Sequence, residues 1–127
     1  MKIQMINHLP IVTVGIKYNE KTKTFHNVLI DTGCSSTILD TDLSEEIGLF
    51  LDIENAITRQ MYGIGGTEIC IEQKVKNICF GKHQLKNFTM QLGDVRDAHG
   101  FDGIIGSDFL ISNKLMIDFD HMVIRNR

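Results

Sequence analysis

Residues 29–39 of this chain read LIDTGCSSTIL, an acidic triplet between two apolar runs. Asp31 ends an apolar strand, where an ionised carboxylate is costly unless neighbouring groups donate hydrogen bonds to it. Thr32 supplies a hydroxyl group, and Gly33 lacks the Cβ that would keep a second backbone or a ligand away from the carboxylate. Two interpretations follow: an Asp close to a Gly often only forms a turn, or the triplet presents a buried acid for chemistry.

The segments around the triplet are typical of short strands. Apolar residues share one parity between residues 11 and 18, which indicates a half-buried strand. The polar residues 19–24 are expected to form its hairpin turn, and residues 25–30 a second strand that runs directly into Asp31. Further extended segments are expected at residues 37–39, 57–64, 67–80, 88–92, 115–119 and 122–125, with a bulge or turn near Lys76 and Asn77.

Helical signals are few. Asp42, three residues before Glu45, fits an N-terminal capping pattern, and Gly48 fits the end of a short helix. A second short helix is expected at residues 108–112, and residues 93–100 are expected to form a polar loop. Many short strands with little helix predict an all-β barrel or sandwich, and 127 residues predict one domain spanning the chain.

Composition narrows the classes of function. Thirteen Lys and Arg against 16 Asp and Glu give a net charge of −3 without a basic cluster, so no nucleic acid is expected as a partner. The sequence has no run of about 18 apolar residues and no signal-like start, so we expect neither a membrane span nor export. Three cysteines are an odd number, which excludes a full disulfide framework and predicts buried thiols in a reducing, cytoplasmic compartment.

We expect neither a metal nor a cofactor. The five histidines never approach the spacing of an HxxxH or HExxH zinc site. Three further acids, Asp94, Asp97 and Asp102, are not followed by Thr or Ser and then Gly as Asp31 is. Loop and capping roles are therefore expected for them.

Three motifs together resemble those of the retropepsin-like aspartic proteases, in the single-lobed, non-viral form. Residues 29–39 are similar to the catalytic segment of this family, residues 61–66 (MYGIGG) to its glycine-rich flap, and residues 103–110 (GIIGSDFL) to its second signature. The resemblance spans roughly residues 11–125. One departure is Cys34, where retroviral enzymes more often carry Ala, and we expect it to be a small buried apolar residue rather than a redox group.

The resemblance implies a closed β-barrel of the acid protease fold with one or two short helices, acting as an aspartic endopeptidase. It implies that the catalytic residues are Asp31, Thr32 and Gly33, and that a hairpin closes over an extended peptide substrate. The implied substrate-binding residues are Tyr62, Gly63, Ile64, Gly65 and Gly66.

The number of acidic triplets has a consequence for assembly. The mechanism requires two carboxylates, whereas the chain contains one Asp-Thr-Gly triplet and is too short for two lobes. The second acid is therefore expected from a second copy, in a homodimer whose two Asp31 residues meet at the two-fold axis. Residues 2–6 and 122–125 are expected to pair across that axis, since a single chain would leave these strands with unpaired edges.

Alternatives remain for each motif. Gly65 and Gly66 fit any hairpin turn, and residues 103–110 fit a packed strand followed by a helix cap. The alternative for the whole chain is a catalytically silent retropepsin-like module that dimerises or binds peptides. An intact triplet argues against this alternative, since scaffolding gives no reason for a buried acid. Phosphotransfer of the actin-like type would need a longer chain with a second phosphate loop.

Overall fold

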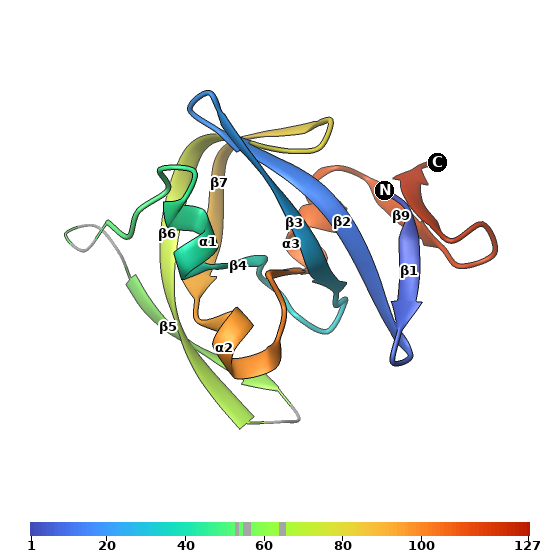
Figure 1. Cartoon of the computed structure of the whole chain (residues 1–127), viewed down its shortest axis with the longest axis horizontal. Helices are drawn as coiled ribbons and strands as arrows, with labels where there is room; N and C mark the ends of the chain where they lie inside the picture. Colours follow the sequence, from blue (N-terminus) through green and yellow to red (C-terminus); the bar gives the residue numbers. More distant parts are fainter. Residues whose placement is uncertain (53, 55–56, 64–65) are drawn as a thin grey trace.

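The computed structural model of the protein describes residues 1–52, 54, 57–63 and 66–127, which form an all-β fold with three short helices (Figure 1). The predicted fold class is confirmed. The elements in chain order are β1 (Ile3–Ile6), β2 (Leu9–Tyr18), β3 (Lys21–Ile30), β4 (Ile38–Asp40), α1 (Thr41–Glu45), β5 (Ile57–Gly63), β6 (Gly66–Phe80), β7 (His83–Gly93), α2 (Val95–His99), β8 (Gly103–Ile105), α3 (Ser107–Ser112), β9 (Leu115–Asp118) and β10 (Val123–Asn126).

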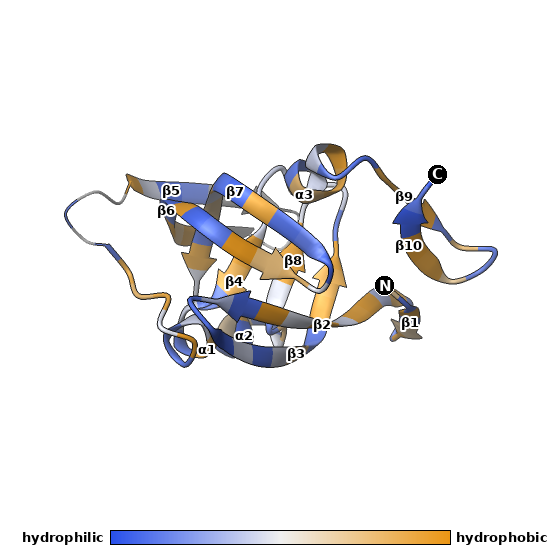
Figure 2. Ribbon diagram, turned by 90° about the horizontal axis from the view of Figure 1, so that it is seen from above, coloured by the Kyte–Doolittle hydropathy of each residue, from blue (hydrophilic) through white to orange (hydrophobic). Residues whose placement is uncertain are grey.

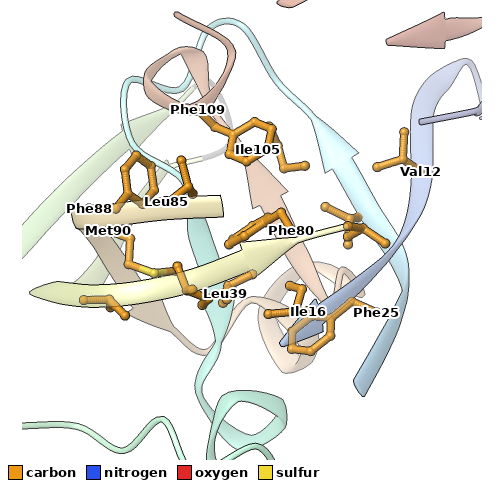
Figure 3. Packing of buried hydrophobic residues seen from close by; sticks show 14 of the residues in the cluster. Val12, Ile16, Phe25, Leu39, Phe80, Leu85, Phe88, Met90, Ile105 and Phe109 are labelled. Atoms are coloured by element: carbon orange, nitrogen blue, oxygen red, sulfur yellow. The ribbon is translucent and has the colours of Figure 1, made fainter. Parts of the chain in front are cut away.

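The main sheet closes into a barrel. Its strand order is β1-β2-β3-β8-β4-β7-β6-β5, and β2 pairs in addition with β6. The added pairing joins Ile16 to Phe80 and Lys17 to Cys79, so the two halves of the sheet meet and enclose a core. Figure 3 shows this core, where Phe25, Phe80 and Phe109 have no exposed surface.

The strand β8 occupies the centre of the fold. It runs parallel to β3 and antiparallel to β4, so the loop that joins β3 to β4 passes around it. A Cβ on Gly103 would lie 3.0 Å from Leu39 Cδ2 and 3.1 Å from the Ile38 carbonyl oxygen. The glycine thus permits close approach of the two backbones, and the end of β3 lies beside the end of β8.

Several of the predicted boundaries are wrong, and β7, for example, begins at His83 rather than at residue 88. Residues 21–24, expected in a turn, belong to β3, because a two-residue turn suffices when Asn19 and Glu20 both take positive φ, at 46° and 70°. Residues 93–100, expected as a loop, contain α2. Its Arg96 N–H donates at 3.0 Å to the buried carboxylate of Asp40, a distant partner that the local sequence does not reveal.

The predicted cap and bulge also differ in detail. The helix α1 is capped by Asp40, which accepts at 3.2 Å from Leu43 N, and Asp42 lies in the first turn. The pairing of β6 with β7 keeps one register on both sides of Lys76, so there is no one-sided bulge. Both strands change their inward face at this point, and Asn87, opposite Lys76, has a φ of 53°.

The two chain ends pair with each other. Ile3 N donates to Met122 O at 2.8 Å, Ile124 N donates to Met1 O at 2.7 Å, and β1 also pairs with β2. The expectation that a single chain leaves these strands unpaired is wrong, because the barrel brings both ends to one place and their backbone groups satisfy each other. Since Lys2 and Val123 bridge the two sheets, β9 becomes an outer strand within the described part of the chain.

Candidate active site

Asp31 lies where β3 ends, at the start of a loop of residues 31–37 that we call the Asp31 loop. Its N–H donates to the Ile105 carbonyl at 2.9 Å, and Gly33 N donates to Asp31 Oδ1 at 2.9 Å. The side chain therefore does form a turn, as the simpler interpretation of the sequence holds. Asp31 remains half-buried while Thr32 and Gly33 are exposed, so the triplet faces outward from the end of an apolar strand.

The turn between β8 and α3 holds the Asp31 loop from the other side. Ser107 N donates to Cys34 O at 2.8 Å, and Ser107 Oγ donates to Thr32 O at 2.7 Å. A Cβ on Gly106 would lie only 2.6 Å from Cys34 O and 3.0 Å from Ser36 O. The glycine of the second motif is thus required by the close passage of the Asp31 loop.

The Asp31 loop ends at Thr37, a fully buried residue that is bound on three sides. Its N–H and hydroxyl donate to the carboxylate of Asp108 at 3.0 and 2.8 Å, and its Oγ1 accepts from Gly106 N at 3.2 Å. Its carbonyl accepts from Gln91 N at 2.9 Å. Thr37 and Asp108 were not predicted as parts of the site, although both lie inside motifs that resemble those of the family.

The interior next to the Asp31 loop is apolar. Ile38, Cys70 and Val95 form a small buried cluster, against which Cys34 and Ile104 pack. Burial raises the pKa of the Cys34 thiol, and the nearby Asp31 and Asp108 carboxylates raise it further against the lowering effect of the Ser36 backbone. The neutral thiol is thus favoured, and none of the three cysteines forms a disulfide.

The residues expected in the flap lie at the end of a two-stranded arm. In the pairing of β5 with β6, Tyr62 faces Thr67 and Gly63 faces Gly66, while Ile64 and Gly65 lie outside the described residues. Residues 66–70 of β6 pair only with β5 among the described strands, since pairing with β7 begins at Ile71. We call residues 57–63 and 66–70 the hairpin arm, which Figure 1 shows extending beyond the barrel.

The other acids have distinct surroundings. Asp102 Oδ2 accepts from His26 N at 3.1 Å and Asn27 N at 3.3 Å, where the β2–β3 register shifts. Asp94 occupies the N-cap position of α2, and desolvation and the neighbouring Asp97 raise its pKa. Asp94, Asp97 and Asp42 bring their oxygens within 4.8 Å of one another on the exposed surface. Asp102 thus has a structural role, and Asp94 and Asp97 belong to a short helix rather than to the Asp31 loop.

A protein-family model described as aspartyl protease matches residues 13–109. The chain belongs to this retropepsin-like aspartyl protease family. The matched range includes the Asp31 loop, the hairpin arm and the turn at Gly106. A search of curated proteins finds no match to the chain. In the part of the chain that the structure describes, none of its helices has the length and apolar character needed to span a membrane.

Proposed function

We propose that the protein is an aspartic endopeptidase that hydrolyses extended polypeptides, with Asp31 as the catalytic acid and base. The observation that carries this proposal is the fixed, outward-facing position of the triplet. Asp31 is held by Ile105 O and Gly33 N, and the two residues after it are exposed beside it. Because the chain belongs to the aspartyl protease family, peptide hydrolysis is the reaction that we propose for the Asp31 carboxylate.

The second carboxylate would come from a second chain. Two Asp31 carboxylates about 3 Å apart cannot both ionise, so the pair would share one proton. One carboxylate then acts as general base on a water molecule, and the other as general acid on the scissile carbonyl. The exposed Thr32 is available to hold the two triplets together across the axis.

An apolar surface near the chain ends supports dimerisation there. Large apolar side chains are exposed at the adjoining ends of β1 and β2, on α3, and on β9 and just after it. Figure 2 shows β1, β9 and both termini at one end of the molecule. These residues are Met5, Ile6, Leu9, Ile111, Met116 and Phe119, and we call them the terminal apolar face. Because the chain ends already pair within one chain, we propose that the dimer uses this face and the outer strand β9.

The substrate would lie extended beneath the hairpin arm. Main-chain hydrogen bonds would hold the peptide, and the arm, with Tyr62, Gly63, Ile64, Gly65 and Gly66 at its end, would close over it and exclude water. We expect an acidic pH optimum, because the reaction needs one protonated and one ionised carboxylate. We propose that the protein acts in a reducing compartment such as the cytoplasm, since its three cysteines form no disulfide.

The test is cleavage of a mixed peptide library at several acidic pH values, read by mass spectrometry. The wild-type protein should cleave, and Asp31→Asn should abolish cleavage while retaining the fold, checked by thermal unfolding. Undiminished cleavage by folded Asp31→Asn would rule out the assignment of Asp31. A folded wild-type dimer that binds peptides without cutting them would instead favour the catalytically silent module.

A further inference from the structure

The Asp31 loop is fixed at its far end by one carboxylate. Asp108, in the first turn of α3, accepts hydrogen bonds from Thr37 N at 3.0 Å, from Thr37 Oγ1 at 2.8 Å and from Phe109 N at 2.7 Å. Two of these donors belong to the Asp31 loop and the third to the start of α3. Hydrogen bonds to an ionised acceptor are about twice as strong as neutral ones, so Asp108 is a strong link between the two segments.

The arrangement around Thr37 leaves little freedom. The residue has no exposed surface, and its hydroxyl both donates to Asp108 and accepts from Gly106 N. Loss of the carboxylate would leave a buried N–H and a buried hydroxyl without this acceptor, and burying an unsatisfied polar group is unfavourable. The backbone at Thr37 would therefore shift to find other partners.

A displacement of the Thr37 backbone would also displace Asp31, because only five residues separate the two. Between Asp31 and Thr37, the loop is tied to the neighbouring turn through the two bonds of Ser107 to Cys34 O and Thr32 O. Ser107 directly precedes Asp108 in the chain, so a displacement of Asp108 would also weaken the hydrogen bonds of Ser107. Displacing a reacting group by about 1 Å is sufficient to slow an enzyme about 100-fold.

We propose that Asp108 is a positioning residue that sets the place of the Asp31 carboxylate through Thr37, without touching the substrate. This inference rests on the proposed protease function. It assigns the acid of the second motif a role in turnover rather than only in packing.

The experiment compares four variants at the two ends of this contact. Asp108→Asn keeps an acceptor oxygen for the Thr37 hydroxyl but presents an NH2 group to Thr37 N, and should lower kcat about 10-fold with little change in KM. Asp108→Ala removes every acceptor and should lower kcat about 100-fold. Thr37→Val removes the hydroxyl but leaves the Thr37 N–H bonded to Asp108, and should lower kcat about 10-fold, whereas Thr37→Ser keeps the hydroxyl and should retain most of the activity.

Asp102→Asn is the matched control. Asp102 also accepts two backbone N–H groups, but from His26 and Asn27 in β3, so its loss should reduce stability without reducing kcat in the folded fraction. Combining Asp108→Ala with Thr37→Val should cost much less than the sum of the two single effects, because both remove the hydrogen bond between the two side chains.

Amide hydrogen exchange provides a readout that does not depend on cleavage. Residues 32–37 should exchange faster in Asp108→Asn than in the wild-type protein or in Asp102→Asn. Normal kcat together with unchanged exchange in folded Asp108→Asn would overturn the inference. If the wild-type protein cleaves no peptide, the proposed function fails, and faster exchange would still establish that Asp108 fixes the loop.

Discussion

The Asp31 loop and the hairpin arm are both surface segments of the same sheet, yet they are held in opposite ways. The loop is bound to β8, α3 and β7 through Ile105, Ser107, Asp108 and Gln91. Among the described strands, the backbone of residues 66–70 pairs only with β5, and Cys70 at the base of the arm packs against Ile38 and Val95. We therefore expect the loop to keep a carboxylate in place and the end of the arm to bend relative to the barrel.

The largest effect should follow from disturbing the fixed region at Gly106. Gly106→Ala would place a Cβ 2.6 Å from Cys34 O, a backbone atom that cannot move without displacing the Asp31 loop. We expect loss of activity and a large drop in the unfolding temperature. Gly15→Ala is the control, since its Cβ would lie 4.0 Å from the nearest side-chain atom and should leave both measurements nearly unchanged. A stable, active Gly106→Ala protein would show that the loop is not held as tightly as described.

An intermediate effect should come from stiffening the free region. Replacing Gly65 and Gly66 together with Val removes the backbone freedom of the hairpin tip, and we expect turnover to fall about 10- to 100-fold. The arm adds little to the barrel core, so the unfolding temperature and the dimer dissociation constant should change little. Wild-type kinetics in this double variant would mean that the hairpin tip is an ordinary turn without a role in turnover.

The smallest effect concerns a carboxylate outside both regions. Asp118 accepts from His121 N at 3.0 Å, from the His121 ring and from the Arg125 guanidinium, and these contacts lower its pKa far below the ordinary value of about 3.9. A lowered folded-state pKa gives stability that is present above the ordinary pKa and is lost as the pH falls through the lowered value.

Asp118→Asn should therefore reduce the unfolding temperature modestly at pH 5 to 7, with the difference from wild type shrinking progressively as the pH falls below about 4. Thermal unfolding across this pH range measures the effect, and Asp120→Asn, whose side chain is almost fully exposed, is the control. Equal unfolding temperatures for the two variants at pH 6 would mean that the contacts of Asp118 do not stabilise the hairpin of β9 and β10.

Local sequence patterns were sufficient for much of the fold. Alternation in residues 11–18 predicted β2, and apolar residues leading into Asp31 predicted the buried end of β3, because both signals depend on neighbours in the chain. The patterns failed where distant residues decide the outcome. The helix α2 depends on Asp40, 56 residues away from Arg96, and the ends of the chain pair with each other rather than remaining free.

The residues of the candidate site also fall into those that a local motif predicts and those that depend on distant contacts. Asp31, Thr32 and Gly33 are adjacent in sequence, so a short motif was sufficient to find them. Thr37 and Asp108 are 71 residues apart, and their hydrogen bond requires β8 to pass between β3 and β4. The sequence singled out both segments but contained no local signal that the two side chains meet.

The central claim, that two chains each supply one Asp31 carboxylate, is tested most directly by mixing chains. Wild-type protein at a fixed concentration is equilibrated with increasing amounts of Asp31→Asn, and peptide cleavage is followed. Added Asp31→Asn that also carries Phe119→Asp on the terminal apolar face serves as the control and should suppress much less. If the active site is shared by two chains, activity per wild-type chain should fall as mixed dimers replace wild-type dimers. Activity that stays constant per wild-type chain, at concentrations where sedimentation shows mixed dimers, would contradict it.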